Sequence, residues 1–120
     1  MPQNIEKIVI AWLETIVDED WPVSAEKAAQ QPTQFILVDR TGGPREAMVL
    51  DRAEILIEVY HKESRVTASD KANEIADRIP ELLNYSENIT HAEVNSLVSL
   101  DDTIAQYSRY QIYCDIYLRR

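Results

Sequence analysis

The stretch FILVDRTGGPREAMVLDRAEILIEVYHK, residues 35–62, contains two β-rich runs on either side of a Gly-Gly pair. In the second run, three apolar residues alternate with other side chains and mark the face that we expect to be buried: Ile55, Ile57 and Val59. Two such runs joined by a short glycine-containing segment are typical of a β-hairpin. Because the second run is long for one strand, we expect a bulge or bend near Asp51-Arg52. Residues 35–62 therefore predict a hairpin.

The Gly-Gly pair could also be read as part of a phosphate-binding loop. Gly42 and Gly43 are the only two glycines in the 120 residues. A P-loop needs the pattern G-x-x-x-x-G-K-[ST] between a strand and a helix, whereas here Pro-Arg-Glu and a second strand follow Gly43. Glycine adopts positive φ angles freely and proline stiffens a turn. The pair therefore predicts a tight turn rather than a ligand site.

Two helices are expected outside this hairpin. Apolar residues recur at helical spacing from Ile5 to Val17, which predicts a helix over about 4–18 with one buried stripe. A second helix is expected over 64–84, capped by Ser64 or Thr67 and kinked or ended early by Pro80. The segment between the first helix and the hairpin, residues 19–34, is expected to be a mostly irregular connector.

Two further strands complete the expected fold, over about 88–100 and 105–119. The last one alternates strictly, and five of its side chains form the face expected to be buried: Tyr110, Ile112, Cys114, Ile116 and Leu118. The element order is α-β-β-α-β-β. We therefore predict a single α+β domain over residues 1–120, with an antiparallel sheet and both helices packed on one face.

Composition excludes several classes of protein. The 21 acidic and 12 basic residues give a net charge of −9, which argues against a general nucleic-acid binder. A single cysteine permits no internal disulfide. The longest apolar run, residues 8–13, is too short to span a bilayer, and the N-terminus does not resemble a signal peptide. These features predict a soluble protein of a reducing compartment with no membrane partner.

No catalytic or metal-binding pattern emerges from the residues. His61 and His91 lie thirty residues apart and, with one cysteine, form no metal-binding spacing. Cys114 falls on the apolar face of its strand, where thiols are usually inert. The acidic pairs match no EF-hand loop: Asp18 with Asp20, and Asp101 with Asp102. We therefore expect no enzyme activity, no metal and no cofactor.

The other face of the last strand carries an amphipathic aromatic stripe. Tyr107, Tyr113 and Tyr117 alternate with Arg109 and other polar residues, and tyrosine and arginine are enriched at protein–protein interfaces. Two other interpretations stay open. The stripe could be an ordinary solvent-facing sheet surface, or a nucleic-acid stacking platform, which the acidic composition disfavours.

The order of these elements resembles the tail terminator proteins of long-tailed bacteriophages, also known as tail completion or head–tail joining proteins. The resemblance rests on the strand that runs into Arg-Thr-Gly-Gly, on VLDRAEILIEVY, on the alanine-rich helix and on a closing strand with Arg109-Tyr110. It extends from about Phe35 to Arg119. The sequence departs from the pattern in the connector VSAEKAAQQP, which is longer and more helix-prone, and in the loop SLDDTIAQYS, which lacks the usual proline and glycine.

The resemblance implies a structural subunit that forms a ring, typically a hexamer, on the head-proximal end of the tail tube. Such a ring ends polymerisation of the major tail tube protein and offers a surface to the head–tail connector or stopper. The virion neck is then the expected location, after assembly in the host cytoplasm. An acidic lumen would let DNA slide through without specific binding.

Under this interpretation, nine residues are candidates for contact with a neighbouring subunit or the tube: Arg40, Gly42, Gly43, Arg45, Arg52, Tyr107, Arg109, Tyr113 and Tyr117. Two alternatives remain at this stage. One is a head-side closure, stopper or connector subunit, and the other is a small acidic regulatory module that binds one basic protein.

Overall fold

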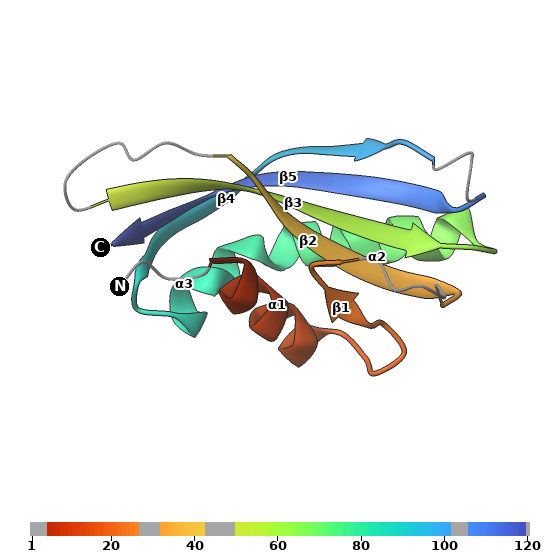
Figure 1. The fold of residues 1–120 in the computed structure, drawn as a ribbon, viewed down its shortest axis with the longest axis horizontal. Coiled ribbons are helices and arrows are strands. Elements are labelled where there is room, and N and C mark those ends of the chain that lie inside the picture. Colours follow the sequence, from red (N-terminus) through yellow and green to blue (C-terminus); the bar gives the residue numbers. More distant parts are fainter. Residues whose placement is uncertain (1–4, 27–31, 43–49, 102–105, 120) are drawn as a thin grey trace.

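A β-sheet with the helices packed on one of its faces makes up the fold (Figure 1). The structure is a computed structural model, and it describes residues 5–26, 32–42, 50–101 and 106–119. The elements follow in chain order: α1 (Ile5–Ile16), β1 (Val23–Ser24), β2 (Gln34–Gly42), β3 (Leu50–His61), α2 (Arg65–Arg78), the 3₁₀ turn η1 (Ile79–Glu81), α3 (Leu82–Tyr85), β4 (Ile89–Ser99) and β5 (Ser108–Arg119). The predicted α+β class is confirmed.

The strands of this sheet lie in the order β1-β2-β3-β5-β4. β2 and β3 pair antiparallel from Gln34 opposite His61 to Gly42 opposite Glu54, so the two runs that opened the sequence analysis do pair. β5 pairs antiparallel with both β3 and β4 and lies between them. β3 and β4 are therefore parallel to each other, and α2 connects them on one side of the sheet (Figure 1).

The expected purely antiparallel sheet needs one correction, because the connector contains a short strand. β1 pairs in parallel with β2, with Val23 opposite Ile36, and the Ile36 amide donates a hydrogen bond to the Pro22 carbonyl oxygen at 2.8 Å. The sheet is therefore mixed. A two-residue strand that begins directly after a proline has no alternation to reveal it, which is why the sequence predicted an irregular segment.

The bulge expected near Asp51-Arg52 is also misplaced. β3 pairs with β5 without interruption from Leu50 to His61. The irregularity lies instead in β2, between Arg40 and Gly42, and β4 has a comparable one between Val94 and Ser96. The bulges therefore lie in the two strands that flank the central pair. The expected turn at Gly43 lies outside the described residues.

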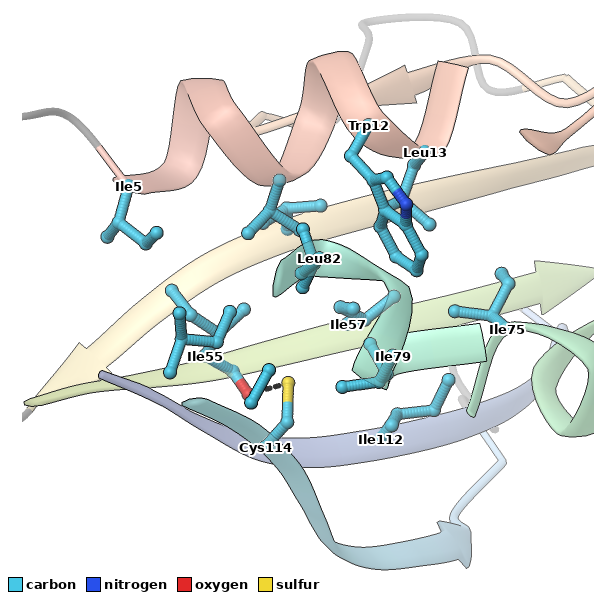
Figure 2. Packing of buried hydrophobic residues seen from close by; sticks show 14 of the residues in the cluster. Ile5, Trp12, Leu13, Ile55, Ile57, Ile75, Ile79, Leu82, Ile112 and Cys114 are labelled. Atoms are coloured by element: carbon cyan, nitrogen blue, oxygen red, sulfur yellow. Dashed lines mark hydrogen bonds between the residues drawn. The ribbon is translucent and has the colours of Figure 1, made fainter. Parts of the chain in front are cut away.

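The main core lies between the sheet and the helices (Figure 2). Trp12 and Leu13 of α1 point into this core, which also contains Leu82 of α3, Ile57 of β3 and Ile112 of β5. The apolar stripe of the first helix is thus buried within its own subunit, as its spacing predicts. α2 contributes a narrower stripe of buried side chains: Ala68, Ala72 and Ile75.

α2 begins and ends at the residues that the sequence marks. Ser64 is its N-cap, and the hydroxyl oxygen accepts a hydrogen bond from the Thr67 amide at 3.0 Å. α2 ends at Arg78, and Pro80 lies in the 3₁₀ turn that separates it from α3. Proline has no amide hydrogen to continue the helix, so the predicted interruption is confirmed.

Replacing Ser64 with alanine is expected to lower the free energy of unfolding by about 1 kcal/mol, because an N-cap oxygen is lost. Ser64→Asp is the matched control, since it keeps a side-chain oxygen at the cap and adds a negative charge that the helix N-terminus favours. Urea unfolding followed by circular dichroism measures both. Equal losses in the two variants would contradict the capping role.

The Cys114 thiol is buried in the main core and donates its hydrogen to the Ile55 carbonyl oxygen at 3.5 Å (Figure 2). Burial raises the pKa of this thiol from 9.0 to about 12, and the negative charge of Asp115 adds to the effect. The reactive thiolate is therefore scarce at neutral pH.

We expect Cys114 to resist Ellman's reagent at pH 8 in the folded protein and to react fully in guanidinium chloride. The same pKa shift makes the fold less stable in alkali. Because the unfolded thiol loses its proton near pH 9 while the folded one holds it until about pH 12, stability falls as the pH rises through this range. Rapid labelling of the native protein would contradict the burial. Cys114→Ala, which has no thiol to titrate, is the control for the alkaline loss.

Candidate interaction surface

The face of the sheet opposite the helices is the candidate interaction surface, and we call it the open face. The helices cover the other face of the sheet (Figure 1). The open face carries the alternate side chains of β2, β3 and β5 that do not belong to the main core. These include the aromatic stripe that the last strand predicted. The structure shows which of these side chains reach the surface and which are used inside the subunit.

Part of the open face forms a second, smaller core. Its members are Phe35, Leu37, Tyr60 and Tyr107. The rings of Phe35 and Tyr60 stack with centroids 4.4 Å apart, and Tyr107 packs edge-on against both. The Tyr107 hydroxyl donates to the Pro32 carbonyl oxygen at 2.7 Å. Tyr107 is therefore 7% exposed, because its ring closes this core and its hydroxyl bonds to the segment before β2.

Arg109 is likewise engaged within the subunit. Its guanidinium lies 3.5 Å from the Glu58 carboxylate, donates to the Leu100 carbonyl oxygen at 2.8 Å and lies over the Tyr60 ring at 5.8 Å from the centroid. The Gln111 amide donates to the same Glu58 carboxylate at 3.0 Å. These contacts tie β3, β5 and the end of β4 together.

The other candidate residues divide into four groups. Tyr113 is 36% exposed and Tyr117 is half-buried, so both reach the surface of the open face. Arg40 is exposed, and Arg52 is half-buried with its guanidinium 3.9 Å from Glu54. Gly42 is the last residue of β2. Gly43 and Arg45 lie outside the described residues.

A hollow of about 160 Å³ lies on the open face beside Tyr113, and no pattern in the sequence predicted a hollow there. Its polar lining comes from four strands: Thr41, Glu54, Asn95, Tyr113 and Asp115. The alternation of β3 and β5 does place Glu54 and Asp115 on the open face. Only the pairing register brings them directly opposite each other, and one sequence cannot supply that register.

A second polar cluster joins the start of α2 to the end of β4. Arg65 donates to the Ser99 hydroxyl at 2.8 Å and pairs with Asp101 at 3.1 Å. The pKa of the nearby Tyr110 phenol is lowered, chiefly by its hydrogen bond with Ser69. This cluster joins α2 to the sheet.

The two histidines and the acidic residues do not form a metal centre in the described part of the chain. No group of three or more His, Cys, Asp or Glu side chains there is arranged to hold an ion. His61 is buried, and its Nδ1 accepts hydrogen bonds from the amides of Glu63 and Ser64. It therefore shapes the turn between β3 and α2. None of the described helices is long and apolar enough to cross a membrane.

Comparison with known proteins gives a fold but no family. No protein-family model matches the sequence, and no curated protein matches it. Among solved structures, the fold is similar to that of a chain in the "Virion of native gene transfer agent (GTA) particle", with a TM-score of 0.68 over 94% of each chain. The two sequences are 8% identical, so the likeness shows a shared fold across nearly the whole chain.

Proposed function

We propose that this protein is a structural subunit of a phage-like virion. The observation that carries the proposal is the fold match to a chain of a gene transfer agent virion, which covers 94% of both chains and leaves little of either outside the common fold. The chemistry of the described residues agrees with a non-enzymatic role. The one thiol is buried and protonated, and His61 serves a turn.

Within that class, we propose the specific role of a tail terminator. The subunit forms a ring, a hexamer as in the family that the sequence resembles, that caps the head-proximal end of the tail tube and meets the head connector. The exposed parts of the open face, with Tyr113 and Tyr117, and the exposed Arg40 support subunit or tube contacts. The net charge of −9 suits a ring through which DNA passes without being held.

The test combines assembly with a tube-capping assay. Light scattering after size exclusion, over a range of protein concentrations, is expected to show a hexamer-sized species. Purified tail tube protein is then polymerised with and without the subunit and imaged by negative-stain electron microscopy. Capped tubes of limited length are expected with the subunit, and the tube protein alone is the control.

Two results would contradict the tail role. A strict monomer that leaves tube length unchanged would remove the terminator function altogether. Binding to purified head connectors without any effect on tubes would assign the subunit to head-side closure instead.

A further inference from the structure

Three carboxylates form a row across the open face of the sheet. Glu54 of β3 lies directly opposite Asp115 of β5, and Asp115 lies opposite Glu93 of β4. Directly opposed residues have Cβ atoms about 4.5–5.5 Å apart, and like charges in such positions destabilise a sheet. The outer two acids have basic neighbours, since Arg52 lies 3.9 Å from Glu54 and His91 lies 3.3 Å from Glu93.

Asp115, the central member of this row, is the exception. It is only 9% exposed, and its carboxylate has no hydrogen bond or ion pair among the described residues. Its oxygens are not fully buried, because no fully buried side-chain oxygen among the described residues lacks a hydrogen bond, so the carboxylate is in contact with the space beside it. Asp115 lines the 160 Å³ hollow together with Glu54. The subunit therefore holds a shielded negative charge that faces a space.

The shape of the sheet keeps this space open. The bulge of β2 falls between Arg40 and Gly42, beside Glu54, and that of β4 falls between Val94 and Ser96, beside Cys114 and Tyr113. Bulges redirect side chains and are frequent beside functional sites. Here they place Thr41 and Asn95 in the lining of the hollow.

We propose that this hollow receives a lysine or arginine side chain from a second copy of the chain. The inference rests on the proposed ring, and it names the contact through which subunits recognise each other. The ammonium or guanidinium group would donate hydrogen bonds to the carboxylates of Asp115 and Glu54. Further acceptor oxygens in the lining belong to Thr41, Asn95 and Tyr113.

The size and charge of the hollow favour a side chain over a metal ion. The volume exceeds that of a bare ion, and the described part of the chain holds no group of three metal-binding side chains here or elsewhere.

The chain itself supplies a cation for this contact. Lys62 is exposed, and its side chain forms no ion pair within the described residues. Lys62 lies eight residues beyond Glu54, about 26 Å along the strand direction, so it does not reach the hollow of its own subunit. A basic group on one part of a subunit and an acidic hollow on another form a head-to-tail contact, which generates a ring when the rotation closes.

Asp115→Asn is the decisive variant, because it removes the charge and keeps the shape. Glu93→Gln is the matched control: it neutralises a carboxylate of the same row that does not line the hollow. Sedimentation velocity over a concentration series measures subunit association. We expect Asp115→Asn to weaken association by about tenfold or more, as for other shielded charge pairs, and Glu93→Gln to change it little. Thermal unfolding of the dilute Asp115→Asn subunit should show equal or higher stability.

Each outcome separates this inference from the proposed function. If wild type and Asp115→Asn associate equally, the inference is overturned and the proposed ring is unaffected. If Asp115→Asn and Glu93→Gln weaken association equally, the inference is also overturned, because the net charge of the subunit and not the hollow would then be responsible. A wild-type protein that never associates overturns both. An assembly that is sensitive to Asp115→Asn but never caps tail tubes keeps the inference and removes the tail role.

Discussion

Trp12→Ala is expected to lower the free energy of unfolding by about 3–5 kcal/mol, the usual cost of truncating a buried large aromatic residue. Trp12 is 2% exposed and lies where α1 packs on the sheet (Figure 2). Its removal leaves a cavity in the main core, next to Leu13. Because native domains are stable by only about 5–15 kcal/mol, a loss of this size leaves a large unfolded fraction.

Tyr85→Ala is the matched control, since Tyr85 is also a large aromatic residue on the helix side but is 43% exposed. Its expected loss is below about 1 kcal/mol. Chemical denaturation gives the free energy of unfolding of both variants. It is followed by tryptophan fluorescence, which comes from Trp21 alone in Trp12→Ala, and is checked by circular dichroism. If Trp12→Ala were as mild as the control, α1 would not be part of this subunit's core and would instead be free to pack elsewhere.

Phe35→Ala is expected to lower the free energy of unfolding by about 3–5 kcal/mol as well, although Phe35 lies on the other side of the sheet. Its ring stacks on Tyr60 and meets the edge of Tyr107, and it is 5% exposed. Truncation removes both aromatic contacts and exposes the hydrogen bond between Tyr107 and Pro32 to water. The segment before β2 should then become more accessible.

Phe35→Leu separates the two contributions. Leucine keeps most of the buried apolar area but loses the ring contacts, so we expect a loss well below that of alanine. Limited proteolysis near residue 32 supplies a second readout. A Phe35→Ala variant of wild-type stability and unchanged cleavage would show that the small core contributes nothing.

Local patterns of the sequence predicted the helix side of the fold. The stripe of α1, the cap at Ser64, the interruption at Pro80 and the apolar face of β5 all reflect contacts that recur every two to four residues. Each of these signals is decided within one element, and each is confirmed. The strand β1 was missed because two residues are too few to show any period.

The open face was harder to predict, because the burial of its side chains depends on which strands are neighbours in the sheet. Alternation places Tyr107 and Tyr113 on the same side of β5, yet one is buried and the other exposed. The difference arises from Phe35 and Tyr60, which lie beside Tyr107 only in the folded sheet. The hollow around Asp115 needs the register of three strand pairs together with two bulges. Neither the register nor the bulges can be read from one strand alone.

The position of β5 also has a consequence for how the sheet folds. β5 is the last strand in the sequence but lies in the interior of the sheet, so β3 and β4 have no partner on that side until it arrives. Closing the sheet requires β5 to pair with β3 and with β4 along almost their whole lengths, and the β3 pairing joins segments about 50–70 residues apart in sequence. The sheet is complete only when β5 has paired between β3 and β4, and non-local pairing of this kind is slow.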